Sequence, residues 1–170
     1  AATQERTLDN AAWPAARPFL SVLTPFFRDD PRPLIEALDR EAAALGGQVE
    51  AVLLDDGGGD EELAQQVSRA VQTLALPARL IRLAANEGRS KGRNRLARNA
   101  RAGRLLFLDS DMLPDSPDFL ARWVAIAREQ DPAVAFGGFS LAQIAPRPEH
   151  ALHRQLASRS DCAPAEVRRR

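Results

Sequence analysis

Short apolar runs alternate with amphipathic segments along most of the chain, starting at Phe19. The apolar runs predict β-strands at 19–24, 49–54, 79–83, 104–109 and 133–139. The intervening segments repeat apolar residues at helical spacing and predict helices at 33–45, 60–74, 90–102 and 117–130. Because crossover connections join strands that alternate with helices, we expect an α/β fold with a mostly parallel sheet and helices on both faces.

Residues at the ends of the helical segments support these assignments. Asp60 is placed to cap the second predicted helix, and Ser116 and Pro117 precede the fourth. Gly46 and Gly103 each follow a helical segment, where glycine commonly ends a helix. These signals limit the predicted helices to ordinary globular lengths.

The pattern changes near both ends of the chain. Residues 1–18 carry Pro14 and Pro18 and no sustained period, which predicts an extended arm that lies on the domain. The regular pattern is also lost after Ser140. We therefore expect a folded core at 19–140 and a separate segment at 141–170.

Composition narrows the functional classes. Lys and Arg number 23 and Asp and Glu also number 23, so no net field favours nucleic acid or an anionic membrane as a partner. Cys162 is the only cysteine, which excludes an internal disulfide and a zinc site built from cysteines. The sequence contains no run of about 20 apolar residues and begins without a signal-peptide core, so we expect a cytoplasmic protein with no membrane span.

Acidic and amide residues follow three of the predicted strands, where ligands bind in open parallel sheets. Asp55 and Asp56 end the second strand, in the run VLLDDGGGD. One interpretation is that these residues recognise a nucleobase, with the glycines allowing close approach of the backbone. The other is a tight turn followed by the Asp60 cap, and this run alone does not decide between them.

The run LLFLDSDM places Asp109 and Asp111 two positions apart after the fourth strand. Carboxylates, water and substrate phosphate are the usual ligands of Mg²⁺ or Mn²⁺, so we favour a metal site here. The alternative is a carboxylate pair that caps a turn before Pro114.

The segment from Gly88 to Arg104 is rich in arginine and contains no acidic residue, which indicates a local anion site. Arg93 falls on the apolar stripe of the predicted helix and therefore needs a partner, which a pyrophosphate would supply. The other arginines on this segment fit a solvated helix face: Arg95, Arg98 and Arg101. His150 and His153 are interpreted as residues of a surface helix and not as metal ligands.

Four motifs in series resemble family 2 glycosyltransferases, inverting enzymes with the GT-A fold. They are VLTPFF, LLDDGGGD, NEGRSKGRN and FLDSDM, and together they span about residues 19 to 115. DSDM is particularly similar to the branch of chondroitin polymerases and related polysaccharide synthases. The resemblance implies transfer of a sugar from a nucleotide-diphosphate donor, a UDP-sugar above all, to the hydroxyl of a saccharide or other acceptor.

The resemblance also assigns roles to individual residues. Thr24 and Phe26 would border the base, Asp56 would accept from a uracil ring, and Arg93 would lie near the diphosphate. The full set of expected nucleotide-sugar-binding residues is Thr24, Pro25, Phe26, Asp56, Asn86, Arg93, Asp109 and Ser110. The expected ligands of the Mn²⁺ or Mg²⁺ cofactor are Asp109 and Asp111.

The sequence departs from the family in one important respect. The family's catalytic aspartate lies in a later Glu-Asp motif, and no such pair follows Met112. We therefore expect residues 141–170 to be the start of an incomplete acceptor-binding half, truncated at the C-terminus. Two alternatives stay open, which are a non-catalytic nucleotide-sugar-binding module and a metal-dependent nucleotidyltransferase.

Overall fold

The computed structural model describes residues 4–141, 148, 151–159 and 162. The chain divides into two compact units, Ala1–Asp131 and Pro132–Arg170. The first unit contains a five-stranded sheet and four α-helices. The candidate chemistry of the sequence therefore falls within this first unit.

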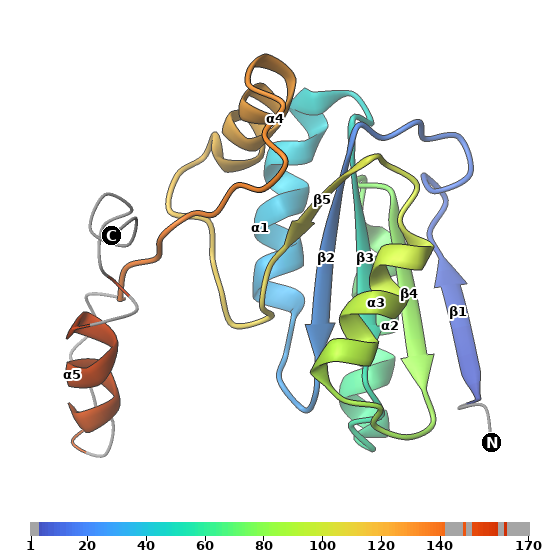
Figure 1. Cartoon of the computed structure of the whole chain (residues 1–170). Coiled ribbons are helices and arrows are strands. Elements are labelled where there is room, and N and C mark those ends of the chain that lie inside the picture. The colour runs from blue at the N-terminus through green and yellow to red at the C-terminus, as the bar shows by residue number, and fades with distance from the viewer. Residues whose placement is uncertain (1–3, 142–147, 149–150, 160–161, 163–170) are drawn as a thin grey trace. The chain divides into compact units, whose positions relative to one another are not determined.

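The sheet has the strand order β1-β4-β3-β2-β5. Its strands are β1 (Glu5–Asp9), β2 (Leu20–Phe26), β3 (Val49–Asp55), β4 (Ala78–Leu83) and β5 (Arg104–Phe107). Only β1 runs antiparallel to its neighbour, and the other pairs are parallel. The arrowheads of β2 and β4 in Figure 1 point to the same edge of the sheet. The predicted mostly parallel sheet is confirmed.

The helices of the first unit lie close to their predicted positions. They are α1 (Arg32–Ala42) with the 3₁₀ turn η1 (Ala43–Leu45), α2 (Glu61–Thr73), α3 (Arg89–Asn99) and α4 (Phe119–Glu129). The Asp60 carboxylate accepts from the backbone N–H of Leu63 at 3.0 Å, so the predicted cap is confirmed. Gly46 ends η1 in the left-handed conformation, as expected, with a φ of 56°. Two predicted ends are wrong, because α3 stops before Gly103 and α4 begins only after Asp118.

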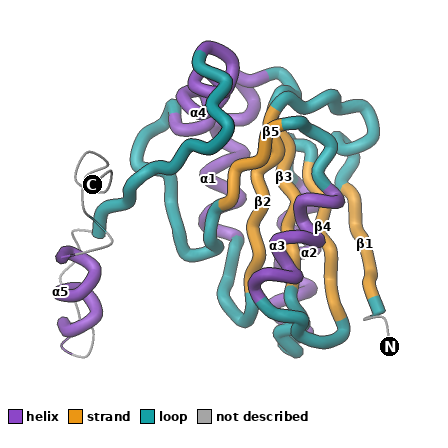
Figure 2. The backbone as a smooth tube through the Cα atoms, in the orientation of Figure 1, coloured by secondary structure: helices purple, strands orange, loops and turns teal. Residues whose placement is uncertain are grey.

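Helices cover both faces of the sheet, as predicted. On β3, Ala51 and Leu53 belong to the core cluster shared with α1, α2 and α4. The alternate residues Val52 and Leu54 belong to a second cluster, which includes Leu96 of α3. Figures 1 and 2 show α3 in front of the sheet and α1 behind it. Strand alternation thus separates two buried apolar layers, one on each face of the sheet.

The N-terminal arm is part of the sheet. Its residues Glu5–Asp9 form β1, which pairs with β4 so that Thr7 lies opposite Ile81. Asn10 follows, with a buried side-chain amide that donates to the carbonyls of Leu74 and Leu76 at 3.1 and 2.8 Å. The arm is therefore anchored by backbone pairing and by a buried side chain.

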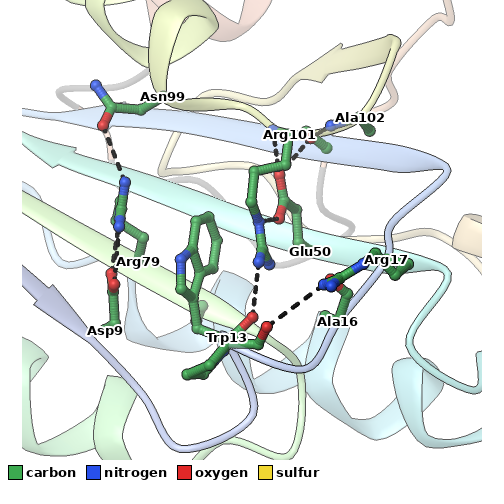
Figure 3. Close-up of polar contacts among 12 residues, drawn as sticks. Asp9, Trp13, Ala16, Arg17, Glu50, Arg79, Asn99, Arg101 and Ala102 are labelled. Carbon is green, nitrogen blue, oxygen red and sulfur yellow. Dashed lines mark hydrogen bonds and ion pairs between the residues drawn. The ribbon is translucent and has the colours of Figure 1, made fainter.

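A polar cluster at the amino ends of the parallel strands joins the arm to the sheet (Figure 3). Glu50 of β3 is fully buried, and it accepts from the Ser21 hydroxyl at 2.6 Å and from Nε of Arg101 at 2.7 Å. The Arg101 guanidinium lies 3.7 Å from the ring centroid of Trp13 and donates to the Trp13 carbonyl. The prediction of a solvated Arg101 is wrong, because this arginine neutralises a buried carboxylate.

In the second unit the structure describes residues 132–141, 148, 151–159 and 162. Residues 133–139 form no strand, so that prediction is wrong, and Val134 and Phe136 are exposed. The helix of this unit is α5 (Ala151–Arg159). His153 lies within α5, whereas His150 lies outside the described residues. In the described parts of both units, no helix has the length and apolar character needed to cross a membrane.

Candidate functional site

A cavity of about 570 Å³ opens at the carboxyl ends of the parallel strands. It is lined by the end of β2 and by the segments that follow β2, β3, β4 and β5. The lining residues are Pro25, Phe26, Phe27, Asp29, Asp56, Asn86, Gly88, Arg89, Gly92, Asp109, Ser110 and Asp111. Its size is typical of a site for a small molecule or cofactor. Its position is the one that ligands take in open α/β sheets, because loops diverge from the sheet there.

The structure brings most of the predicted site residues together at this cavity. Those that line it are Pro25, Phe26, Asp56, Asn86, Asp109, Ser110 and Asp111. Thr24 lies inside β2, is 1% exposed and does not line the cavity. Arg93 does not line it either, but it contacts Asp109, which does.

Several lining residues are not among the predicted nucleotide-sugar or metal residues, and of these Phe27, Asp29 and Arg89 carry large or charged side chains. Phe27 and Asp29 lie beyond the end of β2, in the loop that leads to α1. Arg89 is the first residue of α3. The predicted start of that helix at Ser90 was a usable signal for Arg89, because a helix that begins at a sheet edge points its first residues toward the ligand.

The buried carboxylate of Asp56 organises the loop between β4 and α3. Its Oδ1 accepts from the backbone N–H of Glu87 at 2.8 Å. Its Oδ2 accepts from the Asn86 side-chain amide at 3.0 Å and from the backbone N–H of Gly88 at 3.1 Å. Asp56 therefore fixes three consecutive loop residues, two of which line the cavity.

The neighbouring Asp55 and the glycines make a tight turn. Oδ1 of Asp55 accepts from the backbone N–H of Gly58 at 3.1 Å. Gly57 has a φ of 68°, and a Cβ atom at this position would lie 2.3 Å from the carbonyl carbon of Ala85. Only glycine fits, because the backbone of the β4–α3 loop passes against this turn. The run VLLDDGGGD thus combines a turn with a carboxylate that reaches the cavity.

The loop after β2 contributes an aromatic wall. Phe27 is 40% exposed and lines the cavity, and the Arg28 guanidinium lies 4.9 Å from its ring centroid. Arg28 has a φ of 63° and donates from Nε to the Gly58 carbonyl at 3.1 Å. A positive φ is costly for arginine, so this hydrogen bond helps to hold the loop in its conformation.

Two arginines of α3 contact the Asp109 carboxylate. Nη2 of Arg93 donates to Oδ1 of Asp109 at 2.8 Å, and Nη2 of Arg89 lies 3.6 Å from Oδ2. The Arg89 side chain is 79% exposed and that of Asp109 is 43% exposed. The partner of Arg93 in the structure is therefore a carboxylate, and the exposed Arg89 remains accessible to a second anion.

The amino end of α3 approaches the sheet closely. Gly92 is buried, and a Cβ atom there would lie 3.0 Å from Cδ2 of Leu54. This close packing directs the start of the helix, at Arg89, toward the cavity. The free N–H groups and the dipole of a helix start favour an anionic ligand.

Asp111 is an accessible carboxylate at the cavity. It is exposed, lines the cavity and makes no hydrogen bond or ion pair within the described residues. In the part of the chain that the structure describes, no three His, Cys, Asp or Glu side chains gather closely enough to hold a metal ion. Asp109 and Asp111 alone would therefore hold a metal ion only with further oxygens from water or a phosphate ligand, as is common for Mg²⁺.

Comparisons with solved structures show which fold this arrangement belongs to. The structure of S. aureus TarS 1-349 has a TM-score of 0.53 and 21% identity, and the match covers 73% of this chain and 38% of that one. The mannosyltransferase PcManGT from Pyrobaculum calidifontis, solved in complex with GDP-Man and Mn²⁺, has a TM-score of 0.53 and 24% identity, with 71% and 35% covered. Both likenesses show the GT-A fold, and this chain matches little more than a third of each structure.

The sequence itself gives the family. No curated protein matches the chain significantly. The sequence model described as glycosyl transferase family 2 matches residues 21–163, which include every residue that lines the cavity. The chain therefore belongs to glycosyl transferase family 2.

Proposed function

We propose that the cavity binds a nucleotide-diphosphate sugar, specifically a UDP-sugar, for transfer to an acceptor hydroxyl. The observation that carries this proposal is the convergence of Asp56, Asp109 and Asp111 with Arg89 on one cavity at the carboxyl ends of the strands. A nucleotide diphosphate needs groups that recognise the base, groups that neutralise the phosphates and space for the sugar. The aromatic and acidic residues, the arginines and the volume of this cavity support all three assignments.

The nucleoside half is assigned to the side of the cavity formed by Pro25, Phe26 and Asp56. Phe26 and the exposed ring of Phe27 offer apolar surface for a base. Asp56 already accepts three hydrogen bonds, so only its remaining acceptor capacity is available to the base. Its main role is to hold the Asn86 side chain in position at the cavity. Thr24 supports this side from within β2.

The diphosphate half is assigned to the start of α3 and the Asp109–Asp111 turn. Arg93 and Arg89 supply positive charge, and the helix start supplies backbone N–H groups. Asp111, with Asp109 beside it, would hold Mn²⁺ or Mg²⁺. When bound, such an ion stabilises negative charge that develops on the departing diphosphate.

The reaction we propose is inverting transfer in the synthesis of a polysaccharide or other glycoconjugate, as the chondroitin-polymerase-like DSDM motif suggests. Such transfer needs a carboxylate that takes the proton of the acceptor hydroxyl. Of the carboxylates at the cavity, Asp56, Asp109 and Asp111 have other proposed roles, and Asp29 lies in the loop after β2, next to the aromatic wall. Since no Glu-Asp pair follows Met112, we propose that these 170 residues bind the donor and transfer sugar poorly.

Calorimetry with UDP tests the donor site. UDP is expected to bind at least about tenfold more tightly with Mn²⁺ than with chelator, and Asp111→Asn should remove most of this difference. The matched control is Asp115→Asn, an exposed carboxylate on the same loop that does not line the cavity. Equal UDP affinity with metal and chelator would contradict the metal assignment, and GDP measured in parallel tests the choice of base.

A transfer assay separates the enzyme from the non-catalytic alternative. The chain is incubated with a labelled UDP-sugar and several acceptor saccharides, and product is measured against donor hydrolysis. We expect binding without acceptor-dependent transfer, because a positioned base typically contributes ~10²–10⁴-fold to the rate. Robust acceptor-dependent transfer would show that a base lies within these residues.

A further inference from the structure

The loop that joins β4 to α3 is held from two sides. Its backbone N–H groups at Glu87 and Gly88 donate to Asp56, on the cavity side. The side chain of Glu87 extends instead toward α3, where Arg95 binds it through two hydrogen bonds. Nε of Arg95 donates to Oε1 at 2.7 Å and Nη2 donates to Oε2 at 2.8 Å.

This ion pair is largely shielded from water. The Glu87 side chain is 11% exposed and the Arg95 side chain 24%. The hydrogen bonds from Arg95 hold the pKa of Glu87 below its usual range, and the same contact raises the pKa of Arg95. The prediction that Arg95 lies on a solvated helix face is therefore wrong, because its guanidinium is bound in a shielded ion pair. The two parallel hydrogen bonds also fix the orientation of Glu87 and Arg95 relative to each other.

Arg95 also reaches the N-terminal arm. Its Nη1 donates to the carboxylate of Glu5 on β1, so one guanidinium connects β1, α3 and the β4–α3 loop. Arg95 does not line the cavity. Its contacts therefore bear on the loop and not on a ligand.

The loop has little freedom to shift without consequence. The backbone at Ala85 and Asn86 passes so close to Gly57 that a single added methyl group would collide with it. A displacement of the loop would also break the hydrogen bonds that Asn86, Glu87 and Gly88 make to Asp56. Whatever holds Glu87 in place therefore also sets the shape of the cavity wall.

We propose that Arg95, acting through Glu87, is a positioning residue for the nucleoside half of the donor site. The inference rests on the proposed function, since it assigns Asp56 and Asn86 to the nucleoside. It adds that β1 takes part, because Glu5 helps to orient Arg95. Arg89 and Arg93, which are assigned to the diphosphate half, contact Asp109 and make no hydrogen bond or ion pair with Glu87 or Arg95.

Binding of two ligands distinguishes positioning from a general charge effect. In the presence of Mn²⁺, Arg95→Met is expected to weaken UDP binding about tenfold and to leave pyrophosphate affinity unchanged. A tenfold loss is typical of substitutions that act on a ligand through a neighbouring residue. The matched control is Arg98→Met, which removes the same charge from an exposed position on the same helix. Equal weakening of both ligands, or equal effects of the two variants, would overturn the proposal.

Arg95→Lys gives a second test that preserves the charge. Lysine cannot form two parallel hydrogen bonds to Glu87, so UDP affinity is expected to fall between wild type and Arg95→Met. If Arg95→Met does not fold, this variant takes its place in the comparison. The role of Arg95 is contradicted if both Arg95→Lys and Arg95→Met bind UDP with the wild-type affinity.

Hydrogen exchange tests the positioning without any ligand. The backbone amides of Glu87 and Gly88 should exchange faster in Arg95→Met, while those of Ala51 and Leu53 in β3 should keep their protection. Unchanged exchange at Glu87 and Gly88 overturns the inference, whatever the binding results. A wild type that binds no UDP overturns the proposed function and the nucleoside assignment, while the exchange result still decides whether Arg95 holds the loop.

Discussion

The two ends of the parallel strands use the same residue types for different purposes. At the amino ends, the Glu50 carboxylate is 0% exposed and is satisfied by Ser21 and Arg101. At the carboxyl ends, Asp109 is 43% exposed and faces Arg93 and the more exposed Arg89. Both sites pair a carboxylate with arginine, and they differ in access to solvent.

This difference separates a structural ion pair from one suited to a ligand. The Glu50 carboxylate is 0% exposed and accepts from Arg101, whose guanidinium lies against the Trp13 ring (Figure 3), so no ligand can reach this carboxylate. Around Asp109, the cavity leaves Arg89 and the carboxylate accessible. An arginine–carboxylate pair therefore indicates a binding site only where neither partner is fully enclosed.

The largest effect is expected at the closed end. Glu50→Ala removes the partner of Arg101 and the acceptor of the buried Ser21 hydroxyl, and should lower the free energy of unfolding by about 3 kcal/mol. Urea unfolding measures it. Glu129→Gln, at an exposed position, is the control and should cost less than about 0.5 kcal/mol. A loss equal to that of the control would mean that the cluster is not structural.

The second prediction concerns the glycine turn at the open end. Gly57→Ala should cost about 2 kcal/mol and weaken UDP binding, because its methyl group collides with the backbone at Ala85. Gly59→Ala is a matched control, since its φ is 74° and a Cβ atom there meets nothing within 4 Å. It should cost about 1 kcal/mol from backbone strain alone, with UDP affinity unchanged. Equal effects would show that the contact with the β4–α3 loop is unimportant.

The sequence predicts the central strands of the sheet better than its edge strand. The strands β2, β3 and β4 are apolar runs buried on both faces, so their carboxyl ends and the polar residues after them could be predicted. Strand β1 could not, because its sequence ERTLD is mostly exposed and only pairing with β4 makes it a strand. The local pattern contains no signal for such an edge strand.

The sequence also does not predict ion pairs between residues that are far apart along the chain. Glu50 lies within an apolar run, and its partner Arg101 comes 51 residues later, so no local spacing reveals the pair. Helical periodicity places Arg95 and Arg101 on a solvated face, because it does not include groups outside the helix. Their partners are Glu87 in the β4–α3 loop and Glu50 in β3. The position of Asp109 and Asp111 at the cavity could be predicted, because the carboxyl ends of parallel strands all lie at the same edge of the sheet.

The third prediction uses acid to test the Glu87–Arg95 pair. Because the pKa of folded Glu87 is lowered, the ionised pair stabilises the fold above the unfolded pKa of about 4.3. This contribution should be lost as the pH falls further, through the folded pKa. The difference in unfolding free energy between wild type and Glu87→Gln should thus be constant from about pH 6 to 7 and shrink below about pH 4. A difference that grows in acid would contradict the direction of the shift.

The smallest effect on stability is expected at Asp109, the open counterpart of Glu50. Its ion pairs with Arg93 and Arg89 are partly exposed, so Asp109→Asn should change the free energy of unfolding by about 0.5 kcal/mol or less. The same substitution frees both arginines, and pyrophosphate should therefore bind more tightly in chelator than it does to wild type. Urea unfolding and calorimetry on one preparation measure the two effects together. If Asp109→Asn destabilised the fold as much as Glu50→Ala, Asp109 would be a structural residue as well. The contrast between the two ends of the sheet would then fail.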